Sequence, residues 1–181
     1  MFELNRGLHR HQDLEKTGAE FVADIETFVA GTIAASIPAS TPASLIERAW
    51  ALAGDYTDWL RWGPSGMPLT GEQIAAHAEA AITILRTAGW NPTYVAGRGI
   101  RDALTHAEIT DTEHQFSGDT RMALDWIFEF LIRALTGAPR AAYNDWDQHP
   151  ARTVQEVFGL LAAAAVFART YGDPAPEAPA A

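Results

Sequence analysis

The sequence predicts an all-α protein, a compact bundle of five to six helices with an N-terminal two-helix extension. Several segments carry apolar residues at intervals of three and four, the spacing of an amphipathic helix. Two capping boxes, Thr70 with Gln73 and Thr153 with Glu156, mark helix starts. Only residues 90–95 have strand character, and that segment is short. We therefore expect helices packed on helices around one core.

Two helices are expected in the N-terminal extension. The first, about residues 13–37, has apolar side chains on one face and acidic ones on the other. The second begins at Pro42, and a short turn over residues 54–62 follows it. The strongest break in the chain comes next, a run of glycine, proline, serine and methionine at residues 63–68. These signals divide the chain into an N-terminal helical extension (1–64), a helical core domain (65–172) and a disordered tail (173–181).

Four segments of the core domain are expected to be helical. The first opens at Thr70, stops at Gly89 and carries one apolar side: Ile74, His77, Ala78, Ala81, Ile82 and Leu85. A shorter helix over residues 100–108 follows, then a polar loop. The two most apolar helices, residues 120–135 and 154–169, are expected at the centre of the bundle. The apolar run of the last helix is about twelve residues, short of the roughly 20 that cross a membrane.

Composition limits the function classes. The 181 residues include 23 acidic and 13 basic ones, and the formal net charge is −10. Such a chain repels nucleic-acid phosphate unless its basic residues cluster, so we expect no direct nucleic-acid binding. The chain has no cysteine, which excludes disulfides and thiolate chemistry. The N-terminus shows no apolar h-region, so a cytoplasmic protein without membrane attachment is expected.

A resemblance rests on motifs in the C-terminal two-thirds, namely Ala88-Gly89-Trp90, Gly99-Ile-Arg-Asp-Ala-Leu104, Tyr143-Asn144-Asp145, Arg152-Thr153 and Glu156-Val157. This part, about residues 70–170, resembles an uncharacterised all-helical domain family common in actinobacteria and their phages and plasmids. In that family a Trp-Asn-Asp triplet precedes the last helix, whereas this chain has Tyr143 in place of the tryptophan. It also lacks a cysteine often seen before the Gly-Ala-Leu-like segment. The resemblance implies a helical fold and a host range, and carries no activity.

One candidate ligand site combines two segments. Arg98 and Arg101 flank a helix start, where free amides and the helix dipole favour an anion. Asn144 and Asp145 lie in a predicted loop before the last helix, and their side chains offer further polar groups. The alternative is structural: the glycines beside Arg98 make a tight turn, and the loop side chains serve as turn and capping groups.

Metal and catalytic motifs are missing from the sequence. No two of the six histidines are spaced as i and i+4, and no HExxH or GxSxG motif occurs. His106, Glu108, Asp111, Glu113 and His114 crowd one loop, which we interpret as a solvated acidic loop. We therefore expect no metal and no cofactor, and no residue is assigned a catalytic role.

An aromatic cluster of Trp50, Tyr56, Trp59 and Trp62 is the remaining functional signal. Aromatic residues at this density are enriched in partner-binding hot spots. The alternative is that they cover the core. We expect a non-enzymatic protein-interaction or regulatory module with an unknown protein partner, encoded by a mobile element, which forms a homodimer through residues 13–62. The alternative function is a small-molecule or anion binder, or an enzyme, with a pocket near residues 97–101 and 144–147.

Overall fold

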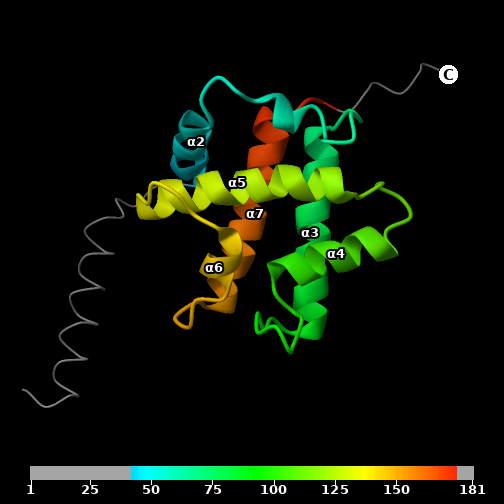
Figure 1. The fold of residues 1–181 in the computed structure, drawn as a ribbon, viewed down its shortest axis with the longest axis vertical. Helices are drawn as coiled ribbons and strands as arrows, with labels where there is room; N and C mark the ends of the chain where they lie inside the picture. The colour runs from blue at the N-terminus through cyan, green and yellow to red at the C-terminus, as the bar shows by residue number, and fades with distance from the viewer. Residues whose placement is uncertain (1–41, 175–181) are drawn as a thin grey trace, which may run out of the picture. The chain divides into compact units, whose positions relative to one another are not determined.

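The computed structural model describes residues 42–174 (Figure 1). The predicted first helix, residues 13–37, and all but two residues of the predicted tail lie outside this range. Residues 42–174 contain six α-helices and one 3-10 turn: α2 (Pro42–Ala53), η1 (Asp58–Leu60), α3 (Gly71–Ala88), α4 (Ile100–Thr110), α5 (Gly118–Thr136), α6 (Tyr143–Asp147) and α7 (Val154–Tyr171). Within that range the β-type pairing is confined to two isolated bridges. The all-α prediction is confirmed.

Helices α3 and α7 pack antiparallel, and α5 crosses both (Figure 1). The first turn of α3 meets the end of α7, where the Gly71 amide donates to the Asp173 carbonyl over 2.8 Å. A Cβ atom at Gly71 would lie 2.3 Å from the Ala168 carbonyl oxygen, so only glycine allows the two backbones to come this close. At the opposite end the Arg86 guanidinium lies 5.4 Å from the centre of the Phe158 ring.

Helix α7 is central, as predicted. Its Val157, Leu161 and Phe167 are fully buried, and the helix packs on α2, α3 and α5. The solvent side of α7 carries Gly159 and Val166, which are exposed, so the helix meets water with small and apolar residues. The lack of polar residues correctly predicted that most of the helix is buried. It gave no sign of the narrow exposed side, because that side is also formed by small and apolar residues.

Helix α2 packs on α5 and α7. Its Ile46 and Ala49 are buried, and the Trp50 ring stacks on Tyr171 with centroids 4.2 Å apart. Residues 42–60 therefore share the core formed by α3, α5 and α7. The second predicted N-terminal helix therefore packs on the core, and its Leu52 stays exposed.

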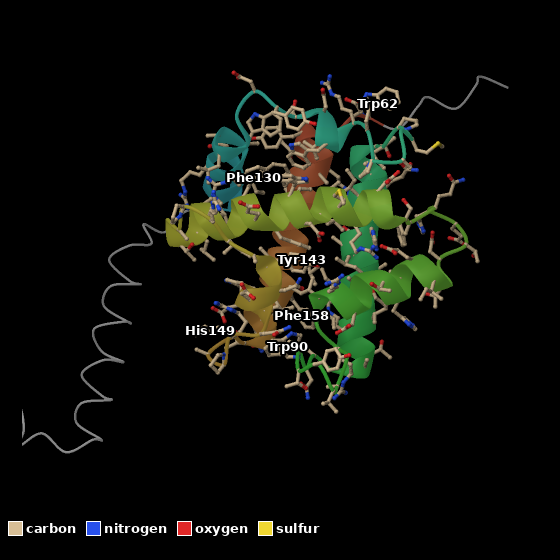
Figure 2. The ribbon with its side chains drawn as sticks, in the orientation of Figure 1. Trp62, Trp90, Phe130, Tyr143, His149 and Phe158 are labelled. Atoms are coloured by element: carbon tan, nitrogen blue, oxygen red, sulfur yellow. The ribbon has the colours of Figure 1, made fainter. Side chains whose placement is uncertain are left out.

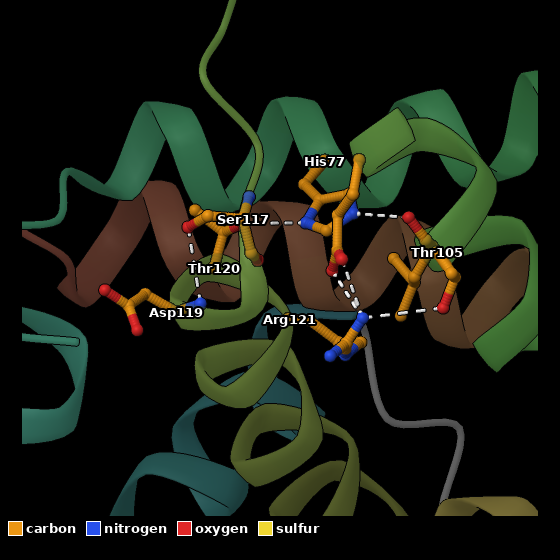
Figure 3. A network of polar contacts seen from close by, with 8 residues as sticks. His77, Thr105, Ser117, Asp119, Thr120 and Arg121 are labelled. Atoms are coloured by element: carbon orange, nitrogen blue, oxygen red, sulfur yellow. Dashed lines mark hydrogen bonds and ion pairs between the residues drawn. The ribbon is translucent and has the colours of Figure 1, made fainter. Parts of the chain in front are cut away.

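A buried histidine joins three helices (Figure 3). His77 of α3 is fully buried, with Nε2 3.0 Å from the Leu104 carbonyl of α4 and Nδ1 2.9 Å from the Thr120 hydroxyl of α5. The carbonyl can only accept, so in the neutral ring Nε2 carries the hydrogen and Nδ1 accepts. Burial lowers the pKa of His77 to about 4. Arg121 of α5 pairs with Glu108 of α4 at 2.7 Å beside it, so a polar seam closes this side of the bundle.

Part of the chain in the described range is a helix where the sequence predicted a loop. Residues 143–147 form the one-turn helix α6, whose first residue Tyr143 packs on the Phe128 ring, 5.2 Å between centroids. None of the helices in residues 42–174 is both long and apolar enough to cross a membrane.

Candidate functional site

An open cavity of about 360 Å³ lies between the segment after α2 and helix α5. We name it the aromatic groove and define it by six of its lining residues: Tyr56, Asp58, Trp59, Trp62, Asp119 and Trp126. Tyr56, Trp62 and Trp126 expose 71%, 55% and 42% of their surface. Large aromatic side chains are usually mostly buried, so three of them exposed around one cavity are unusual.

The inner wall of the aromatic groove is part of the core. Trp59 is buried, and its ring lies 6.4 Å from Trp126 and 5.7 Å from Phe130. Its indole nitrogen donates to the Tyr56 carbonyl over 2.9 Å, which fixes the turn η1. Of the three tryptophans predicted to bind a partner, Trp59 therefore supports the groove and Trp62 lies at its surface. Trp50 lies outside it, stacked on Tyr171.

The loop that carries Trp62 is tied to the rest of the molecule. Trp62 pairs with Pro68 in an isolated antiparallel bridge, and the Gly63 amide donates to the Met67 carbonyl over 2.9 Å. The backbone amide and hydroxyl of Ser65 both donate to the Asp119 carboxylate in the first turn of α5. These bonds fix the loop on α5, so the exposed aromatic surface is formed before any partner arrives.

A second cavity of about 330 Å³, the polar pocket, lies at the start of α4. It contains two of the four residues predicted to bind a ligand, Arg101 and Asn144, together with Asp102, Asp147 and Gln148. Arg98 points elsewhere and donates to the Ala88 carbonyl at the end of α3 over 2.7 Å. Asp145 is exposed and does not line the pocket. The structure thus brings the two predicted segments together through Arg101 and Asn144.

Asp147 belongs to the segment 144–147 that the sequence analysis singled out, but the contacts that it makes were not predicted. Its carboxylate is buried and accepts from the Trp90 indole nitrogen over 2.8 Å and from the Ile100 amide over 2.9 Å. Burial raises the pKa of Asp147, and these two hydrogen bonds act in the opposite direction. A Cβ atom at Gly99 would lie 2.7 Å from one carboxylate oxygen, so glycine makes room for it.

The backbone amides at the start of α4 are already bonded to carboxylates of the chain itself. Asp147 binds the Ile100 amide, and Asp102 accepts from the Gly99 amide over 2.9 Å. Two carboxylates therefore already occupy the amides at the positive end of the helix dipole. An external anion would have to compete with both of them, and only the exposed Arg101 favours it.

The motif before the last helix is structural in the same way. Thr153 and Glu156 form the predicted capping box, with the Thr153 amide donating to Glu156 over 2.8 Å. The Arg152 guanidinium lies 3.9 Å from the centre of the Trp146 ring and donates to the Trp146 carbonyl over 3.2 Å. These contacts fasten α6 to the first turn of α7.

The acidic loop between α4 and α5 also has a structural role. The Asp111 carboxylate accepts from the backbone amides of Glu113, His114 and Phe116, and it lies 3.0 Å from Nδ1 of His114. These hydrogen bonds lower the pKa of Asp111. Across residues 42–174 the acidic and histidine side chains nowhere gather into a metal-binding group.

Comparison with known proteins adds one finding to this geometry. Residues 69–167, more than half of the chain, match the model of DUF6197, a family of unknown function. The chain belongs to the DUF6197 family. No curated protein and no solved structure matches it. The match confirms that an uncharacterised domain family covers about residues 70–170; the actinobacterial host range stays a prediction. The DUF6197 region contains the polar pocket and the α5 side of the aromatic groove, whereas Tyr56 and Trp62 precede it.

Proposed function

We propose that the chain is a non-enzymatic protein-interaction module that binds its partner through the aromatic groove. The observation that supports this is the set of exposed rings of Tyr56, Trp62 and Trp126 around one cavity. Tryptophan and tyrosine dominate the binding energy of protein interfaces because they bury a large area with few rotatable bonds. Met122, also exposed, extends this apolar surface along α5.

Rigidity is the second support. Interfaces gain affinity when the binding surface needs no reorganisation. Trp126 lies on a helix of 19 residues, Trp62 lies on a loop bonded to that helix through Ser65, and Trp59 links both to the core. A partner would therefore meet a preformed surface.

The test compares groove and pocket variants in the source cells. The tagged chain is crosslinked to its partners in vivo, and the partners are quantified by mass spectrometry. A Trp62→Ala/Trp126→Ala variant should lose a partner at least about ten-fold, the loss expected from hot-spot residues. Arg101→Ala, in the polar pocket, is the matched control and should retain that partner. A partner set unaffected by the groove substitutions would contradict the proposal.

A second candidate function is small-molecule binding in the polar pocket. The observation in its favour is that Arg101 and Asn144, 43 positions apart in the sequence, line one cavity with the Gln148 side chain. None of these three side chains makes a hydrogen bond among the described residues, so all are available to a ligand. In this case Arg101→Ala would abolish ligand-induced thermal stabilisation, and the groove variant would keep it.

We also propose that the chain forms a homodimer through residues 13–62. Among residues 42–62, Ile46 and Ala49 are already buried in the core, and Leu52 is exposed outside the groove. Light scattering at micromolar concentration should give a dimer for the full chain and a folded monomer for a chain starting at Thr41. A chain that begins at Ser65 would lack α2 and its buried Ile46, so the loss of part of the core would complicate the comparison. A monomeric full chain would contradict the homodimer.

A further inference from the structure

We infer that the aromatic groove receives a cationic side chain, an arginine or lysine from a basic segment of the partner protein. This inference rests on the proposed function and names the chemistry of the partner. Two features of the groove carry it: the sign of its charges and the type of its rings.

The charge of the groove has one sign. Its lining includes two carboxylates, Asp58 and Asp119, and no basic side chain from the described part of the chain. Arg61, which follows η1, is directed to Asp173, 3.2 Å away. A neutral or acidic partner would remove the carboxylates from water without compensation, whereas a basic one would pair with them.

Of the two carboxylates, Asp58 is the one free to meet a partner. The Asp119 carboxylate already accepts two hydrogen bonds from Ser65. Asp58 is exposed, and its side chain makes no hydrogen bond or ion pair among residues 42–174. It lies in the turn between Tyr56 and Trp59, so a cation among the rings would be close to it.

The rings themselves favour a cation. The face of a tryptophan or tyrosine ring is electrostatically negative, and tryptophan binds a cation best, within about 6 Å of the ring centre. The groove offers two tryptophans with exposed surface, Trp62 and Trp126, and the exposed Tyr56. The same chain already uses this interaction inside its fold, where Arg152 lies 3.9 Å over Trp146.

Within residues 42–174 the groove and the polar pocket lie far apart, which provides controls. In Figure 2, Trp62 lies at the upper edge and Trp90, the hydrogen-bond partner of Asp147, at the lower end. Asp145, exposed on α6 near the polar pocket, has the same charge as Asp58 and lines neither cavity. It is therefore the matched position for a charge substitution.

The experiment uses two peptides that differ only in charge. The first is acetyl-Ala-Arg-Leu-Arg-Ala-amide, and the second has citrulline, the neutral isostere, at both arginine positions. Binding to the full chain is followed by NMR through the six indole N–H signals, assigned by single tryptophan substitutions. The arginine peptide should shift the Trp62 and Trp126 signals and bind at least about five-fold more tightly than the citrulline peptide.

Substitutions then locate the charge effect. Asp58→Asn should reduce the five-fold preference for the arginine peptide to about two-fold or less, because the preference depends on this carboxylate. Asp145→Asn should leave it unchanged. Equal binding of the two peptides, arginine-dependent shifts confined to other tryptophans, or an equal effect of both substitutions would overturn the inference.

The outcomes separate this inference from the proposed function. If in-cell crosslinking depends on Trp62 and Trp126 while the two peptides bind alike, the groove is an interface for an apolar partner. In that case the proposed function holds, and the inference of a cationic side chain is wrong. If crosslinking is independent of the groove, the proposed function itself fails. Peptide-induced loss of a dimer in light scattering would identify a second copy as the occupant and would also overturn the inference.

Discussion

The aromatic groove and the polar pocket have similar volumes, about 360 and 330 Å³, but their lining groups differ in what they already bind. In the polar pocket the buried Asp147 has both carboxylate oxygens engaged, by Trp90 and Ile100. In the aromatic groove the rings of Tyr56, Trp62 and Trp126 remain in water. In the polar pocket the buried carboxylate is thus fully hydrogen-bonded within the protein, and we call this region the joint because it connects α6 to the start of α4. A rigid surface that keeps large apolar groups in water is better suited to a partner.

The aromatic groove itself also combines a buried structural residue with an exposed one. Trp59 and Trp62 are three positions apart, yet Trp59 is buried and Trp62 is 55% exposed. Trp59→Ala removes a ring that contacts Trp126, Phe130 and Phe167. We expect it to lower the free energy of unfolding by about 3–5 kcal/mol, the usual cost of a large cavity. Urea denaturation measures this; a loss below about 1 kcal/mol would mean that the inner wall of the groove is not core.

The joint at the start of α4 should be the next most sensitive position. Asp147→Ala leaves the half-buried Trp90 indole N–H and the buried Ile100 amide without their acceptor. Each unsatisfied donor costs about 1–3 kcal/mol, so we expect a loss of about 2–4 kcal/mol. Asp145→Ala, two residues away and exposed, should stay within about 0.5 kcal/mol. Similar losses for both variants would remove the distinction between a joint and a surface residue.

Acid should weaken the contact that His77 makes with α4, which lines the polar pocket, and with α5, which lines the aromatic groove. His77 bonds to α4 and α5, and its pKa falls from 6.5 to about 4 on folding because the ring is buried. The unfolded chain therefore binds a proton first, and the stability present above the unfolded pKa is lost as pH falls from 6.5 toward 4. From about pH 7 to about pH 5 we expect a loss of about 2 kcal/mol.

Two variants isolate the histidine in this measurement. His77→Gln should reduce the pH dependence of unfolding over that range, even if it lowers stability at every pH. His149→Gln, at an exposed position, should leave the dependence as it is in the natural sequence. The range from pH 7 to pH 5 ends above the ordinary pKa of a carboxylate. Ion pairs and hydrogen bonds lower the pKa values of Glu72, Glu79 and Glu156 further, so these residues contribute little to the pH dependence of unfolding in this range. Burial raises the pKa values of Asp125 and Asp147, so their protonation acts in the opposite direction, and the decisive comparison is between the natural sequence and His77→Gln. An identical pH dependence in these two chains would contradict the assignment of His77 as neutral.

The sequence predicted those parts of the fold that depend on neighbours along the chain. The capping boxes at Thr70 and Thr153 are both present, and the apolar spacing placed His77 on the buried side of α3. What it did not predict depends on distant residues. Asp147 meets Ile100 across 47 positions and Ser65 meets Asp119 across 54, and no local pattern encodes either contact.

The candidate sites divide in the same way. The density of aromatic residues drew attention to the segment with Tyr56 and Trp62, but the third exposed ring of the groove, Trp126, comes from α5, which the sequence placed at the centre of the bundle. The sequence also placed Arg98 beside Arg101, whereas the tight turn directs Arg98 to the end of α3. Which of two neighbouring side chains faces a cavity depends on backbone turns that periodicity does not describe.

The smallest expected change in stability belongs to Trp62→Ala, and it carries the main conclusion. Trp62 is 55% exposed, and its loop is fixed by backbone bonds and by Ser65, which do not involve the indole ring. Removing the ring should change the free energy of unfolding by less than about 0.5 kcal/mol, as for other surface substitutions. The same change should weaken partner binding at least about ten-fold, because an aromatic hot spot contributes to the complex and not to the fold. Urea denaturation and in-cell crosslinking on the same variant give both quantities. A large loss of stability together with unchanged partner binding would mean that Trp62 covers the core and that the groove is not the interface.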